Sequence, residues 1–188
     1  IFWPELLSLQ DCFNLLVAMD PLPLAFSPNN TTAVLAFDGR IFFVDVIKAE
    51  FIGWTRRLED GWIDTHQYSP DGGFVLAAGN DGDIGTIRLL TKDAVEMWTY
   101  SREALLFPME AIDTLAFSSC SNKVACIESE TPHIYIINMQ TGHPHKLTMS
   151  LPVNAVVFDP SGERLAIAHD ASICIIDSLS GVNIIEPQ

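Results

Sequence analysis

Four segments of this 188-residue chain show the same order of features, and this repetition constrains the fold more than any other property of the sequence. In each segment an alternating apolar strand ends on an aromatic residue, and a turn follows. These ends and turns are Phe26-Ser27-Pro28-Asn29, Tyr68-Ser69-Pro70-Asp71-Gly72, Phe117-Ser118-Ser119-Cys120 and Phe158-Asp159-Pro160-Ser161-Gly162. The aromatic residues are 42, 49 and 41 residues apart. Repetition at this spacing predicts a tandem array of one supersecondary unit.

Three further strands are predicted in each segment, because runs of β-branched, aromatic and small apolar residues alternate with polar turns. The second strands are predicted at 33–37, 74–78, 123–127 and 164–168. The third strands are predicted at 41–45, 86–90, 134–138 and 173–177. The outer, fourth strands are predicted at 51–56, 95–100, 145–148 and 182–185. Asp38-Gly39 and Asn80-Asp81-Gly82 are strong hairpin signals between second and third strands, because glycine accepts the positive φ of a tight turn. The fold class is therefore all-β.

The segments resemble the WD-repeat family over about residues 20–186. The aromatic-Ser-Pro-Asp-Gly turn is clearest at 68–72, and the Asp-Gly-x-Ile-x-x-hydrophobic-Asp pattern is present at 38–45. The resemblance implies a β-propeller of about four blades, each with four antiparallel strands. The family's Trp-Asp pair is replaced in every copy, by Val44-Asp45, Leu90-Thr91, Ile137-Asn138 and Ile176-Asp177. Its Gly-His pair is also missing, so the family's hydrogen-bond network cannot form in full and apolar packing must stabilise each blade.

The predicted blades are 20–58, 59–103, 108–149 and 150–188. Residues 1–19 are expected to form a strand or helix from a preceding blade or a linker. Because this family most often closes with seven blades, the resemblance implies part of a larger ring of seven or a similar number. Further blades of the same chain or a second copy would close it. A closed four-bladed ring and a dimer that completes eight blades are the less favoured alternatives.

The chain is strongly acidic, with 10 Lys and Arg against 24 Asp and Glu and a net charge of −14. Such a surface repels phosphate backbones, so we expect no nucleic-acid partner. It would favour basic proteins or peptides as partners, but the preferred interpretation is that the charge serves solubility. No apolar stretch is long enough to span a membrane. The four cysteines match no zinc or Cys-x-x-Cys spacing, so we expect reduced, mostly buried thiols in the cytoplasm, with the nucleus as an alternative.

The chemical motifs of the sequence favour structural roles, and we expect no catalytic, cofactor or metal site. The glycine-rich segment 79–85 is followed by a strand, whereas a phosphate loop requires a helix, and it has too few ligands for calcium. The histidine cluster at 133, 143 and 145 has no further zinc ligand at a matching spacing. An alternative is a propeller hydrolase or lyase, for which Asp64, His66 and Asp113 would converge on the central channel.

Two inter-blade connections are the candidate partner-binding sites. The first contributes Arg56, Arg57, Asp60 and Trp62, because Trp and Arg are enriched at binding hot spots. The second contributes Phe107, Met109 and Glu110 from an apolar stretch. The alternative is that Trp62 and Phe107 pack between blades, as we also expect of Trp54 and Trp98 in outer strands.

The predicted function is a protein-interaction scaffold that binds protein or peptide partners through inter-blade loops, and not an enzyme. The resemblance to WD repeats and the lack of a catalytic motif favour this class. A purely architectural domain within a signalling or regulatory protein is the third possibility.

Overall fold

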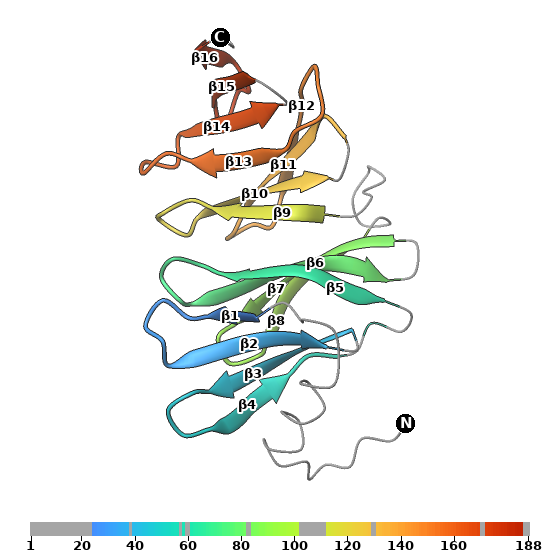
Figure 1. The fold of residues 1–188 in the computed structure, drawn as a ribbon, viewed down its shortest axis with the longest axis vertical. Helices are drawn as coiled ribbons and strands as arrows, with labels where there is room; N and C mark the ends of the chain where they lie inside the picture. Colours follow the sequence, from blue (N-terminus) through green and yellow to red (C-terminus); the bar gives the residue numbers. More distant parts are fainter. Residues whose placement is uncertain are drawn as a thin grey trace.

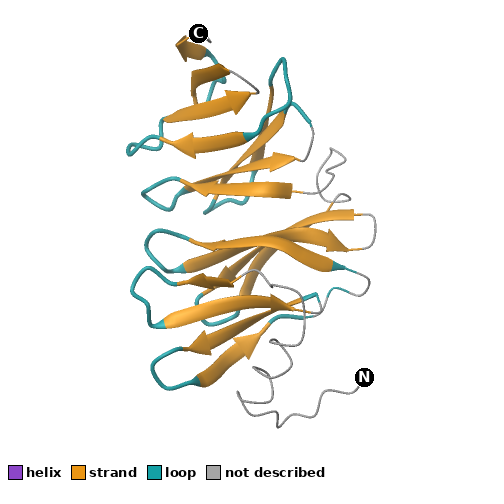
Figure 2. Cartoon of the chain, viewed as in Figure 1, coloured by secondary structure: helices purple, strands orange, loops and turns teal. Residues whose placement is uncertain are grey.

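The computed structural model describes residues 24–37, 39–56, 58, 61–81, 84–101, 112–128, 131–169 and 172–185 of the chain. Strands, turns and loops make up this part of the chain, and Figure 2 shows no helix in it. The described residues therefore contain no helix that is long and apolar enough to cross a membrane.

The strands form four sheets of four, and each sheet is an antiparallel meander in chain order. The first sheet consists of β1 (Leu24–Phe26), β2 (Thr32–Phe37), β3 (Arg40–Asp45) and β4 (Glu50–Trp54). The second consists of β5 (Trp62–Tyr68), β6 (Phe74–Asp81), β7 (Ile84–Thr91) and β8 (Glu96–Ser101). The third consists of β9 (Ile112–Phe117), β10 (Lys123–Glu128), β11 (His133–Asn138) and β12 (Pro144–Thr148). The fourth consists of β13 (Ala155–Phe158), β14 (Arg164–His169), β15 (Ser172–Asp177) and β16 (Asn183–Ile185).

The four sheets stack in chain order, so that the first and the fourth lie at opposite ends of the row (Figure 1). The first strand of each sheet contacts the first strand of the next, which places β1, β5, β9 and β13 along one side. This is the arrangement of consecutive propeller blades, and it confirms the predicted four-bladed architecture. The two end sheets lie apart, so the described residues form an open row and not a closed ring of four.

The turns that follow the aromatic residues are closed by a polar side chain at the next position, which is a buried serine in the first three sheets. The hydroxyls of Ser27, Ser69 and Ser118 each accept a hydrogen bond from the backbone N–H five residues later, all at 3.0 Å. In the fourth sheet Asp159 replaces the serine, and its carboxylate accepts from the N–H of Arg164 at 3.2 Å. Because the bond is local, the same short motif builds the same turn in every sheet.

Alternation along the strands gives each sheet two apolar faces. We call the face toward the next sheet the forward face and the other the backward face. The packed forward faces carry Val34, Ala36, Ile41 and Phe43 in the first sheet, Leu76, Ala78, Ile87 and Leu89 in the second, and Ala125, Ile127, Ile134 and Ile136 in the third. They pack against the backward faces of the second, third and fourth sheets, which include Tyr68, Leu115 and Val156. Burying one such Ile or Leu contributes about 1.5–3 kcal/mol, so these three interfaces are the main source of stability.

The predicted strands are confirmed within one to three residues at their ends. The segment 79–85 lies across the β6–β7 hairpin, where Asp81 pairs with Ile84, as expected. Of the four tryptophans, Trp98 packs against the apolar core between the second and third sheets as predicted. The prediction for Trp54 is wrong, because its side chain is 58% exposed on the backward face of the first sheet, against which no described sheet packs. Residues 1–19 lie outside the described part of the chain.

Candidate interaction site at the connector between the first two sheets

The connector from β4 to β5 spans residues 55–61, and its described residues are fixed to the first sheet by hydrogen bonds. The N–H of Thr55 donates to the carbonyl of Ile41 at 2.9 Å, and the N–H of Ile41 donates to Oγ1 of Thr55 at 3.0 Å. The N–H of Leu58 donates to the carbonyl of Gly39 at 3.0 Å, and the Leu58 side chain is buried in the core between the two sheets. The connector backbone is therefore held against the first sheet at Thr55 and at Leu58.

Gly39 explains why the connector can approach the β2–β3 turn so closely. Its φ of +67° lies in the left-handed region, which favours glycine. A Cβ atom at this position would also lie 2.8 Å from the carbonyl oxygen of Gly61. The hairpin signal at this glycine thus serves a second purpose, because it makes room for the connector.

A buried arginine fixes the connector to the second sheet. The side chain of Arg88, on β7, is almost fully buried and forms an ion pair with Glu96 on β8. Its Nη1 donates to the carbonyl oxygen of Arg56 at 3.1 Å and to Oγ1 of Thr55 at 3.4 Å. Because a buried cation needs a partner charge and full hydrogen bonding, this network specifies where the connector lies.

Glu96 keeps its charge in this network. Burial by itself would raise the pKa of Glu96, but hydrogen bonds from Thr99 and Arg88, and the positive charges of Arg88 and Arg56, hold it below its usual value. The Thr99 hydroxyl donates to Oε1 of Glu96 at 2.6 Å. The ion pair therefore persists at neutral pH.

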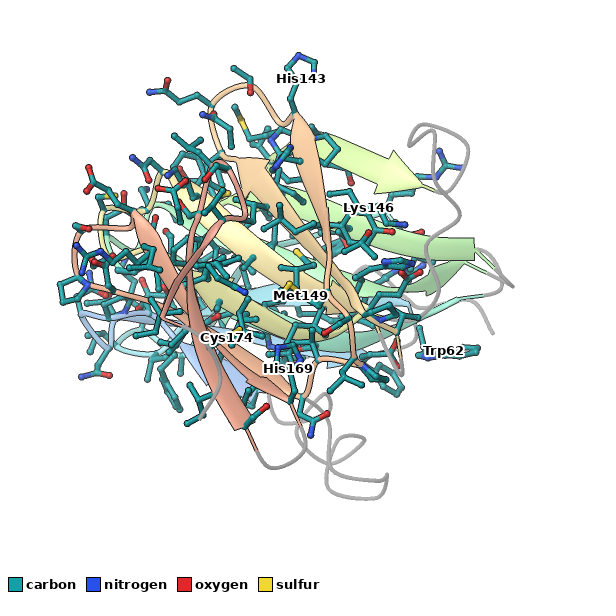
Figure 3. All side chains as sticks on the ribbon, turned by 90° about the horizontal axis from the view of Figure 1, so that it is seen from above. Trp62, His143, Lys146, Met149, His169 and Cys174 are labelled. Atoms are coloured by element: carbon teal, nitrogen blue, oxygen red, sulfur yellow. The ribbon has the colours of Figure 1, made fainter. Side chains whose placement is uncertain are left out.

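The side chains of Arg56 and Trp62 are the exposed features of this anchored connector. Trp62, the first residue of β5, is 53% exposed and projects away from the sheets (Figure 3). The alternative that Trp62 packs between blades is therefore wrong. Gly79 lets the β5 backbone bulge here, because a Cβ at residue 79 would clash with the carbonyl oxygen of Trp62. Exposed Trp and Arg side chains on a hydrogen-bonded backbone are typical of an interaction surface.

The remaining predicted binding residues cannot be placed. Arg57 and Asp60 of the connector, and Phe107, Met109 and Glu110 of the second connection, lie outside the described residues. Arg56 and Trp62 are the described members of this predicted set.

The side chains suspected of catalysis lie in different environments. His66 is buried between the first two sheets, where its Nε2 lies 3.3 Å from the carbonyl oxygen of Val34, and its Nδ1 has no hydrogen-bond partner. Since a carbonyl only accepts, Nε2 carries the proton; burial lowers the pKa of His66. Asp64 is exposed, and the Asp113 side chain lies outside the described part of the chain.

The structure brings together Cys174 and His169, a pair that no sequence motif had linked. Sγ of Cys174 lies 3.4 Å from Nε2 of His169, whose Nδ1 lies 3.3 Å from the carbonyl oxygen of Pro152 (Figure 3). Nδ1 must donate to the carbonyl, so Nε2 accepts from the thiol. Both side chains are buried, and burial raises the pKa of Cys174, which keeps it a thiol and not a nucleophilic thiolate. The register of β14 and β15, which pairs His169 with Ser172, was the signal that could have found it.

Metal ligation has no support in the described residues, which contain no group of three or more His, Cys, Asp or Glu side chains able to hold an ion. His143 and His145 lie where expected, at the turn into the outer strand β12 and within it.

Comparison with known proteins gives one match to a protein family. Residues 134–177 match the family described as "WD domain, G-beta repeat". Residues 134–177 therefore carry a WD repeat. The match covers β11 through β15, which includes the segment with the Ile173–Asp177 ending. A search of curated proteins found no match.

Solved propeller-type structures resemble the whole row of sheets. A chain of Kuenenia stuttgartiensis hydrazine synthase superposes with a TM-score of 0.68 at 17% identity, covering 89% of this chain and 48% of that one. A chain of a mitotic checkpoint complex superposes with a TM-score of 0.65 at 15% identity, covering 87% of this chain and 50% of that one. This chain thus spans about half the length of the two solved chains. The WD-repeat match at residues 134–177 supports a protein-interaction scaffold in general terms, and the solved structures support the propeller fold alone.

Proposed function

We propose that this WD-repeat chain is a rigid scaffold that binds a protein or peptide partner at the connector between its first two sheets, and that it is not an enzyme. The observation that carries the proposal is the exposed Trp62, presented by a connector that is hydrogen-bonded to both neighbouring sheets. Pre-organised aromatic anchors lose little conformational entropy on binding, which favours them as contact residues.

Affinity capture with the purified chain, followed by mass spectrometry, tests this proposal. A partner that binds the connector should be enriched by the natural chain and lost with Trp62→Ala, which removes an exposed side chain without opening a core cavity. We expect an affinity loss of at least about tenfold, as for a hot-spot Trp. Arg56→Ala should weaken binding of the same partner, because it removes an exposed charged side chain. The fold should be kept, because the backbone carbonyl at residue 56 still accepts the hydrogen bond from Arg88.

Leu179→Ala is the matched control, since Leu179 is an apolar side chain at least as exposed as Trp62, on a turn of the fourth sheet. It should leave capture unchanged. If no protein is enriched over a scrambled control, or if the Trp62 and Leu179 variants lose partners to the same extent, the proposed site is wrong.

We propose a basic partner, on the grounds of the net charge of −14. Its binding should weaken as salt rises, because exposed charges more than about 10 Å apart are screened at 0.1 M ionic strength. Titration of the captured partner at two salt concentrations measures this; an affinity that does not change with salt would contradict a basic partner.

A reducing compartment, the cytoplasm, is part of the same proposal. The described cysteines, Cys120, Cys126 and Cys174, are free thiols, and the last two are buried as expected, whereas Cys120 is exposed. Cell fractionation of the tagged chain tests the location, and recovery in an oxidising compartment would contradict it.

A further inference from the structure

A carboxylate accompanies the exposed ring of Trp62, because Asp64 lies two residues further along β5. Both side chains are exposed, whereas Ile63 between them is buried in the core that the first two sheets share. Because successive side chains of a strand point to opposite faces, Trp62 and Asp64 lie on the same side of β5, about 7 Å apart along the strand. An aromatic ring and a negative charge are thus presented to solvent together (Figure 3 shows Trp62 projecting from the sheets).

A β-bulge sets the position of Asp64. Ile63 pairs with Gly79 and Thr65 pairs with Ala78, so Asp64 is the extra residue of the bulge, outside the register of the two strands. Bulges re-aim a side chain, and they are over-represented next to functional sites. The pairing of β5 with β6 therefore does not require a carboxylate at this position.

The fourth sheet shows that the repeat does not require the pair either. Counted back from the aromatic residue that ends each first strand, the positions of Trp62 and Asp64 are occupied in the fourth sheet by Pro152 and Asn154. Both of these residues are exposed, as their counterparts in the second sheet are. The fourth sheet thus forms with neither an aromatic ring nor a charge at these positions, and the combination in the second sheet is not a requirement of the fold.

The charge around Trp62 favours a cation. Asp81, at the end of β6, lies one residue beyond the residue that pairs with Trp62. In the third sheet Asp113 is the extra residue of the same bulge, and its strand β9 contacts β5. The strands β5, β6 and β9 contain no Lys or Arg. Arg56 lies at the other end of the connector, where its charge helps to hold the pKa of Glu96 on β8 below its usual value. The strands around Trp62 therefore contribute negative charge.

We propose that this site binds an arginine side chain of the partner, with its guanidinium stacked on the Trp62 ring and hydrogen-bonded to the Asp64 carboxylate. This inference rests on the proposed function and names the side chain that the site recognises. An aromatic ring attracts a cation within about 6 Å of its centre, and Trp does so most strongly. A guanidinium is planar, so it can stack on the ring while its N–H groups donate to a carboxylate, whereas a lysine ammonium is a compact, strongly hydrated charge.

Peptide titration tests this assignment with the Trp62 indole as the reporter. The probes are a capped glycine–arginine–glycine peptide and its lysine and citrulline counterparts. The indole N–H resonance of Trp62, identified by its absence in Trp62→Phe, should shift with the arginine peptide, and the dissociation constant should be at least about threefold lower than for the lysine peptide. The neutral citrulline peptide should not shift it. If the citrulline or the lysine peptide acts as strongly as the arginine peptide, the proposal is wrong.

Trp54 is the internal control for an exposed ring. It is 58% exposed, against 53% for Trp62, but the residues two positions away from it are Ile52 and Arg56, where Trp62 has Asp64. The indole resonance of Trp54 should therefore stay in place with all three peptides. Parallel shifts of Trp54 and Trp62 would show general contact with exposed rings and would overturn the proposal.

Asp64→Asn tests the carboxylate at nearly constant side-chain size, and its exposed position should tolerate the change. It should raise the dissociation constant of the arginine peptide about two- to fivefold, the size expected for an exposed charge pair. It should weaken capture of the natural partner as well. Asp93→Asn is the matched control, because it removes an exposed charge from the β7–β8 turn at the opposite end of the same sheet, and it should change neither result.

The capture results separate this inference from the proposed function. If Trp62→Ala loses the partner while Asp64→Asn keeps it in full, the connector is the binding site but holds no arginine, and only this inference fails. If Trp62→Ala also keeps the partner, the proposed binding site itself is wrong.

Discussion

Ile134 and Ile173 occupy the same position in the third and fourth sheets, yet one is completely buried and the other is mostly open to solvent. Ile134 lies under the fourth sheet, in the core that both sheets share, whereas no described sheet lies over Ile173. The residue type is the same because the repeat is the same. The difference shows that burial in this architecture is decided by the neighbouring sheet, and not by the strand that carries the residue.

The largest expected effect concerns this pair of isoleucines. Ile134→Ala should lower the free energy of unfolding by about 2–5 kcal/mol, because it leaves a cavity in a packed interface. Ile173→Ala should lower it by less than about 1 kcal/mol in one copy, because little buried surface is lost. Urea denaturation measures both losses of stability, and a protein concentration as low as the signal allows keeps association of chains from contributing. Equal losses would show that Ile173 is covered, and the contrast between the two positions would then be broken.

A smaller effect is expected at the turns, which should not distinguish an end sheet from an inner one. Ser27 and Ser69 are both buried, and each hydroxyl bridges the backbone of its own turn. Ser27→Ala and Ser69→Ala should each cost about 1–2 kcal/mol, the value for leaving buried backbone groups unpaired.

The same denaturation measurement checks the serine variants. If Ser27→Ala, on the end sheet, cost nothing while Ser69→Ala cost the expected amount, the first turn would depend on a neighbouring sheet after all. End sheets and inner sheets would then differ in the stability of their turns as well as in the burial of their faces.

The smallest expected effect is a pH dependence of the interface between the first two sheets. His66 holds the position that Leu24, Leu115 and Val156 hold elsewhere, and burial lowers its pKa below the ordinary value of 6.5. The unfolded chain then binds the proton more readily, so the stability from neutral His66 is complete above about pH 6.5 and declines as the pH falls below it.

His66→Leu, which copies the other repeats, should remove this decline. Thermal unfolding between pH 7 and pH 5 measures it, with His145→Gln on the exposed face of β12 as the control. If His66→Leu and the natural chain lost stability in parallel, protonation of His66 would not be the cause.

Local patterns in the sequence predicted the strands and turns because both depend on nearby residues. Alternation in Trp62–Tyr68 predicted β5, and Asp-Gly at 38–39 predicted a turn in which Gly39 adopts a positive φ. The candidate site was only partly predictable. The sequence pointed to Arg56 and Trp62 from residue type and loop position, but the exposure of Trp62 and the role of Arg88 depend on contacts between separate sheets.

The sequence by itself determined the repeat, the four-stranded unit and the turn chemistry, because hydrogen bonds such as that from Phe74 to Ser69 link residues five apart. The tertiary structure decided which apolar faces are buried, how the connector is anchored, and that His169 meets Cys174. These features arise from packing between sheets whose residues are far apart in the chain. Identical repeat positions such as Ile134 and Ile173 therefore look alike in the sequence and differ only in the fold.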